Sequence, residues 1–182
     1  MIKDYSIIFI KILLLIFLQL IVFNNINLFE FINPSIYILF FILYRFDQNQ
    51  ISLLMASFLI GITIDFFSNT AGANTIASIT ISLIRPTIIK FSLGEVYEFN
   101  SILNKNIKQV NRLFFIFLIV FIHQLLFFMF EYFNFMMLIS ILKNSILNSF
   151  FTIIILFGFI TLFDSKLWLE FYSWGFSLLL LF

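Results

Sequence analysis

Few side chains in this 182-residue chain could take part in acid–base or metal chemistry. The candidates are the single histidine, His123, and two carboxylates beside apolar runs, Asp65 and Glu131. Catalysis by such groups needs a paired acid and base, or a nucleophile beside a base, and the sequence shows neither pattern. One histidine without any cysteine also makes a metal site unfavourable. We therefore expect a protein that is not an enzyme and has no catalytic, cofactor or metal site.

Composition explains why so few groups are reactive. Hydrophobic residues make up 63% of the chain and charged residues only 10%, whereas a soluble domain carries about 25% charged residues. A domain of this length could not bury so much apolar surface in one core. The sequence therefore predicts an all-α integral membrane protein, with residues 1–166 as one domain.

Apolar runs close to 20 residues long predict six transmembrane helices. The second run is weakened by Asn33 and Pro34, so we expect its outer end to be irregular. A shorter run, Phe135–Leu142, is expected at the membrane interface. The aromatic tail at 167–182 is also expected there, and a seventh, partial span is the alternative for it. The predicted spans are residues 6–23, 28–46, 51–67, 71–91, 113–130 and 145–163.

The distribution of Lys and Arg predicts the orientation. Six spans place both termini on one side, and a cytoplasmic amino terminus leaves only Lys143 on the outer side. We therefore expect a multi-pass protein of the bacterial inner membrane, with cytoplasmic N- and C-termini. The nine basic residues then assigned to the inner side are Lys3, Lys11, Arg45, Arg85, Lys90, Lys105, Lys108, Arg112 and Lys166.

Asp65 lies near the predicted outer end of the third span, in Gly61–Ser78, "GITIDFFSNTAGANTIAS". A carboxylate is unfavourable at a helix C-terminus but favourable at the start of the next helix. Ser68, Asn69 and Thr70 are good N-cap types, and Gly72 permits a tight turn. We expect Asp65 to accept hydrogen bonds from the start of the fourth helix. The alternative is an Asp that simply faces water at the interface.

The predicted fourth helix has a face of small residues, Ala71, Thr75, Ser78 and Ser82, at helical spacing. Such faces let helices approach closely in lipid, so we place this helix at the bundle centre. Asn74 adds a polar group, and Arg85-Pro86 is expected to interrupt the helix near its end.

His123 and Glu131 lie two turns apart in "FIHQLLFFMFE", on roughly the same side of the predicted fifth helix. Ionisable groups at this depth face the bundle interior. We favour an interhelical hydrogen bond for His123, and a proton relay or a metal ligand is the alternative.

Four segments, in order, resemble the rod shape-determining protein MreD family in its Bacteroidetes-type form. They are Leu18–Tyr44, Gly61–Ser78, "RPTIIKFSLG" (Arg85–Gly94) and Phe121–Glu131. The resemblance covers about residues 1–165, and the tail after Lys166 departs from it. It implies a non-enzymatic subunit of the cell-elongation machinery, with MreC, MreB and the RodA–transpeptidase pair as partners. The structural or partner-binding candidates are Gly61, Asp65, Ser68, Gly72, Asn74, Ser78, Arg85, Pro86, His123 and Glu131.

A second function is open, that of a small-molecule-binding subunit of an energy-coupling-factor-type vitamin transporter. Such subunits also have six spans in under 200 residues, and MreD-type proteins resemble them in fold. Their first helix typically presents Ala at four-residue spacing, whereas Ser6–Phe23 contains neither Ala nor Gly. The polar groups at membrane depth are also few and scattered in the sequence, which disfavours a ligand site.

Overall fold

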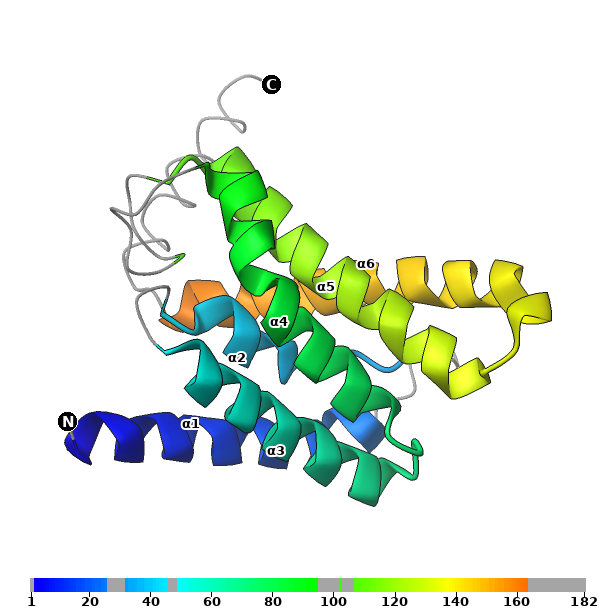
Figure 1. Cartoon of the computed structure of the whole chain (residues 1–182), viewed down its shortest axis with the longest axis horizontal. Coiled ribbons are helices and arrows are strands. Elements are labelled where there is room, and N and C mark those ends of the chain that lie inside the picture. The colour runs from blue at the N-terminus through cyan, green and yellow to red at the C-terminus, as the bar shows by residue number, and fades with distance from the viewer. Residues whose placement is uncertain (1, 26–31, 46–48, 95–101, 103–106, 164–182) are drawn as a thin grey trace, which may run out of the picture.

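The computed structural model of the chain describes residues 2–25, 32–45, 49–94, 102 and 107–163 (Figure 1). These residues form helices and contain no β-strand. The predicted tail at 167–182 lies outside the described residues. The helices are α1 (Ile2–Ile21), η1 (Phe23–Asn25), α2 (Ile38–Leu43), α3 (Gln50–Ser68), α4 (Ala73–Leu93), α5 (Gln109–Tyr132), η2 (Phe135–Met137) and α6 (Leu138–Phe163).

Four helices, α3 to α6, are long and apolar enough to cross a membrane, which indicates a membrane protein. The apolar part of α1 at Ile12–Ile21 is shorter. In Figure 1 the end of α1, the α3–α4 turn and the α5–α6 connection all lie at the right. We call this end of the bundle the turn end.

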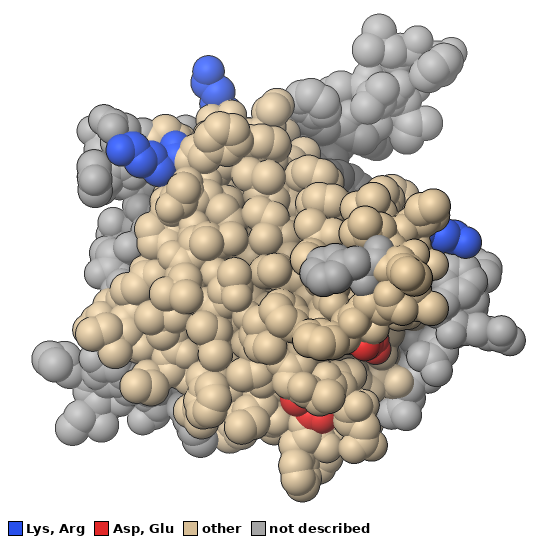
Figure 2. All heavy atoms as spheres, turned by 45° about the vertical axis from the view of Figure 1, so that its right-hand side comes forward, with Lys and Arg blue, Asp and Glu red and all other residues tan. Residues whose placement is uncertain are grey.

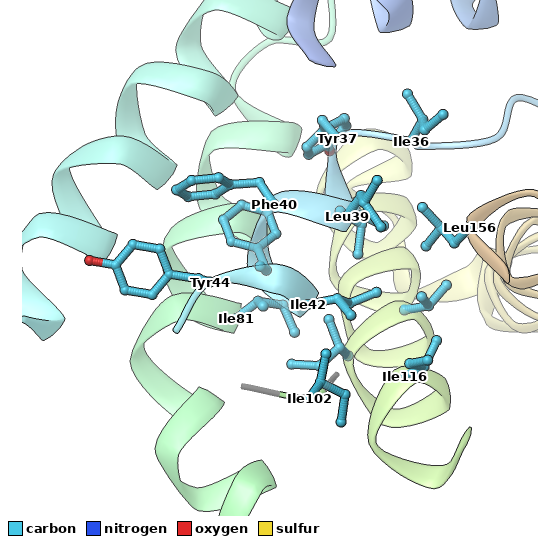
Figure 3. Close-up of a cluster of buried hydrophobic side chains, with 14 of the residues drawn as sticks. Ile36, Tyr37, Leu39, Phe40, Ile42, Tyr44, Ile81, Ile102, Ile116 and Leu156 are labelled. Carbon is cyan, nitrogen blue, oxygen red and sulfur yellow. The ribbon is translucent and has the colours of Figure 1, made fainter. Parts of the chain in front are cut away.

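The six-residue helix α2 lies in the centre of the bundle, against α4 and α5 (Figure 3). Every residue from Ile36 to Ile42 is buried. The helix begins only at Ile38, so the segment before it is irregular, as predicted. Pro34 disfavours helical backbone at Asn33, and residues 33–35 have no regular structure. Non-helical backbone at membrane depth is tolerated where protein surrounds it.

Helix α4 continues through Pro86, so the predicted interruption at Arg85-Pro86 is wrong. Proline lacks the N–H that would bond to the carbonyl four residues earlier, which is that of Ser82. The side-chain amide of Gln50 at the start of α3 donates to this oxygen at 2.8 Å. A neighbouring helix therefore supplies the hydrogen bond that proline removes. The helix also starts at Ala73, which leaves Ala71 exposed and outside the predicted small-residue face.

Replacing Gln50 by Leu should destabilise the protein by roughly 1–2 kcal/mol, because the Ser82 carbonyl loses this donor. We expect Pro86→Ala to be nearly neutral alone and to recover most of the loss in the double variant, since alanine restores the N–H. The midpoints of thermal unfolding in detergent, measured for the two single variants and the double variant, should show this recovery. A double variant no more stable than Gln50→Leu would exclude the compensation.

Helix α6 begins seven residues earlier than predicted, so Phe135–Leu142 leads directly into the sixth helix. Its residues form η2 and the first turns of α6. The side chain of Asn134 accepts from the Met136 N–H at 2.9 Å and so caps this start. Lys143 is exposed on α6, where a long side chain can reach toward the membrane surface.

Helices α3 and α4 pack backbone to backbone at Gly61. A Cβ added there would lie 2.5 Å from Thr75 Cα and 2.9 Å from Thr75 N. On α4, Ser78 and Ser82 are fully buried, whereas Leu83 is exposed. The small residues within the helix therefore face the bundle, as predicted, and close approach of the two helices depends on Gly61.

Gly61→Ala should cost about 1–3 kcal/mol, because the two backbones must separate to admit the methyl group. Gly158→Ala in α6 is the matched control, since nothing lies within 4 Å of its added Cβ. Alanine favours helix, so this control should be neutral or slightly stabilising. The thermal midpoints of both variants provide the comparison, and equal effects would contradict the predicted contact.

Candidate functional site

Asp65 joins the end of α3 to the start of α4. Its Oδ1 accepts hydrogen bonds from Thr70 Oγ1, Asn74 N and Asn74 Nδ2, and its Oδ2 accepts from Thr75 N and Thr75 Oγ1. The first N–H groups of a helix have no partner within it. Asp65 binds two of them, and the negative charge also matches the helix dipole. The predicted hydrogen bonds to the fourth helix are therefore present, and the side chain is only 7% exposed.

The residues that were expected to cap helix α4 do not lie at its N-terminal cap position. Helix α4 is preceded by Gly72 at φ +94°, which makes no side-chain cap, and Asn69 ends α3 in the left-handed region. Thr70 donates to Asp65, and Ser68 accepts from Asn24 Nδ2 at 2.6 Å. The carboxylate of the preceding helix thus replaces a local cap, and only Gly72 serves the turn as predicted.

A buried chain of hydrogen bonds extends from Asp65 to His123. Asn74 donates to Asp65 at 3.0 Å and accepts from the Tyr37 hydroxyl at 2.7 Å. Tyr37 Oη lies 3.0 Å from His123 Nε2, and both side chains are at most 1% exposed. His123 therefore makes the predicted interhelical contact, through Tyr37. The sequence did not single out Tyr37. The chain is rich in aromatic residues, and Tyr37 looks like any other residue of an apolar run.

Polar side chains also satisfy the irregular backbone before α2. Asn148 Oδ1 on α6 accepts from Asn33 N at 2.8 Å, and Gln19 Oε1 on α1 accepts from Ile36 N at 2.7 Å. Gln19 Nε2 also donates to the Pro34 carbonyl at 3.2 Å. Backbone groups away from water need such partners. These two amides therefore hold residues 33–36 in place from two sides.

Arg85 binds the other end of α2. It is 3% exposed. Its Nε donates to the Phe41 carbonyl at 2.7 Å, and an Nη donates to the Tyr44 carbonyl. Its Cζ lies 5.7 Å from the centre of the Tyr44 ring. A cation at the carbonyl end of a helix is favourable. Arg85 therefore caps α2 from inside the bundle.

The candidate residues thus form two groups rather than one site. Asp65, Asn74 and His123 belong to one network, whereas Arg85 lies at the far end of α2. Glu131 is exposed near the end of α5 and makes no hydrogen bond or ion pair with a described residue, so it is not joined to His123. Pro86 is exposed on α4 and acts through the Gln50 contact.

A cavity of about 850 Å³ opens beside the Asp65–His123 network at the turn end. Tyr37 and Asn74 belong to both the network and the cavity wall, and Glu131 also lines it. The prediction that polar groups at membrane depth are scattered is therefore wrong, because folding gathers side chains of α1, α4, α5, α6 and residues 33–37. The polar lining consists of Gln19, Asn24, Asn33, Ser35, Tyr37, Ser68, Thr70, Asn74, Glu131 and Asn148.

Within the described part of the chain, no three His, Asp or Glu side chains come together as a metal site would require. The fold and the networks define a helical membrane protein whose buried charged and polar groups tie its helices to one another. Comparison with protein-family models, curated proteins and solved structures finds no match to this chain.

Proposed function

We propose that this protein is a non-enzymatic scaffold of the bacterial cell-elongation machinery, similar to MreD, which regulates cell shape and lateral peptidoglycan synthesis. In this proposal six segments cross the inner membrane, and both termini are cytoplasmic. Residues 32–45, with the short helix α2, belong to the second crossing. The turn end then faces outward, and the nine basic residues assigned to the inner side support this orientation.

One observation carries the proposal: the buried ionisable groups bind the protein's own helices. Asp65 accepts five hydrogen bonds from residues 70–75, and Arg85 donates to carbonyls at the end of α2. His123 contacts Tyr37 from a fully buried position. Groups engaged in this way favour a rigid frame over a reaction centre. Most of the outward side chains of α3, α5 and α6 are apolar, which suits lipid or partner helices.

The proposed partners are MreC, MreB and the RodA–transpeptidase pair. The test is affinity purification of the tagged full chain from its native membranes, with MreC detected by mass spectrometry. We expect MreC to be retained, and depletion of the protein should round and swell the cells. Loss of the protein without a shape change, or purification without MreC, would reject the proposal.

A second candidate, a small-molecule-binding subunit of an energy-coupling-factor-type transporter, is favoured by the cavity at the turn end. Its volume falls within the range of about 300–1,000 Å³ that ligand pockets occupy. Purification distinguishes the two functions. A bound vitamin together with a coupling subunit would support the transporter, and MreC without either would support the scaffold.

A further inference from the structure

We propose that the cavity at the turn end binds an amphiphile with an uncharged, hydrogen-bonding head group and an apolar chain. This inference does not depend on the scaffold role. It rests on the chemistry of the cavity lining, on the unequal distribution of charge and on the exposed apolar residues at the cavity's edge.

The polar part of the cavity lining is suited to hydroxyl groups. Amide and hydroxyl side chains from several elements meet there, and they both donate and accept hydrogen bonds. Some hydrogen-bonding capacity of the lining is unused. The backbone N–H of Asn33 bonds to Asn148, but the side chain of Asn33 makes no hydrogen bond with a described residue. The hydroxyl of Ser68 accepts from Asn24 and still has a proton to donate.

The charge of the lining disfavours an anion. Among the described lining residues, Glu131 carries the only formal charge, and none is Lys, Arg or His. Asp65 lies directly behind Thr70 and Asn74, which adds a second negative charge nearby. In Figure 2 the acidic side chains lie in the lower part of the visible face, apart from the basic ones at its upper left and right margins. A phosphate or carboxylate head group would therefore be repelled.

Other residues of the cavity lining are suited to a hydrocarbon chain. Phe17 and Ile21 of α1 and Phe67 of α3 line the cavity and are 54–63% exposed. Phe127 and Phe128 of α5 add aromatic surface. One edge of the cavity is therefore continuous with the apolar exterior. A chain can remain against this exterior while the head group reaches the amides, and this geometry favours a lipid-like ligand over a small soluble one.

Single-cysteine labelling tests the proposal, because the natural chain has no cysteine. Asn33→Cys places a thiol in the cavity. Met136→Cys is the control at the same end, since Met136 is 97% exposed and does not line the cavity. The full chain is reconstituted in phosphatidylcholine nanodiscs and treated with a membrane-impermeant maleimide. The probes are octyl β-D-glucoside, D-glucose and octyl phosphate, each below the concentration that disrupts the disc.

We expect octyl glucoside to slow labelling of the Asn33→Cys variant by about threefold or more when its concentration exceeds its Kd. Labelling of the Met136→Cys variant should not change, and octyl phosphate should give little protection to either thiol. In Glu131→Lys combined with Asn33→Cys, octyl phosphate should protect better, because the charge at the cavity is reversed. Equal protection by both amphiphiles would overturn the head-group preference. If D-glucose protected the thiol as well as octyl glucoside does, the ligand would be a soluble molecule and not a lipid-like one. If no probe protected the thiol, the proposed site would be overturned.

Discussion

Arg85→Met should lower the thermal midpoint of the purified protein by on the order of 10 °C. The guanidinium donates to the carbonyls of Phe41 and Tyr44, and the buried end of α2 would lose both donors. Each orphaned buried acceptor costs about 1–3 kcal/mol, so the sum for the two carbonyls is roughly 2–6 kcal/mol. Met retains much of the side-chain volume, which isolates the hydrogen bonds from packing. Heating in detergent followed by size-exclusion chromatography measures the midpoint.

Two variants make this prediction specific. Arg85→Lys should recover only part of the loss, because one ammonium cannot reproduce the two-point geometry of the guanidinium. Lys90→Met removes a positive charge from an exposed position on the same helix and should change the midpoint far less. If Lys90→Met and Arg85→Met were equally destabilised, charge in general rather than the α2 cap would be responsible.

Asp65→Ala should be the most damaging change at the turn end, with a loss of roughly 3–5 kcal/mol. It removes the acceptor for Thr70, Asn74 and Thr75 together, including two backbone N–H groups. Asp65→Asn keeps the shape but points an amide N–H at these donors, so we expect it to recover little. Abundance in membranes and the thermal midpoint measure the loss. An Asn variant as abundant, stable and functional as the natural protein would remove Asp65 from its proposed role.

The hydroxyl contacts allow a double-mutant cycle for the same carboxylate. Thr75→Val deletes the Oγ1 donor to Asp65, and Thr80→Val is the control because its hydroxyl bonds only to the Ile76 carbonyl of its own helix. We expect Thr75→Val to cost about 1 kcal/mol and to couple with Asp65→Ala, because the two residues are in contact. Thr80→Val should be close to neutral and additive with Asp65→Ala.

Local chemistry made several features predictable. Apolar run lengths located α3, α4 and α5 to within a few residues, because spanning length and backbone saturation act on contiguous sequence. The capping of α4 by Asp65 could be predicted because the two segments adjoin. Gly72 was identified for the same reason, since a turn is decided within a few residues. The start of α6 was misplaced because an apolar run interrupted by Lys143 and Asn144 resembles an interfacial segment until packing is known.

The sequence by itself determined a membrane-embedded helical chain with few ionisable groups, because hydropathy and charge are properties of contiguous residues. Only the tertiary structure decided what the buried polar groups contact. Tyr37 meets His123 across 86 positions, Arg85 meets Phe41 across 44, and Asn33 meets Asn148 across 115. The cavity at the turn end is decided in the same way. Such contacts depend on how helices are placed in three dimensions, which no local pattern of residues encodes.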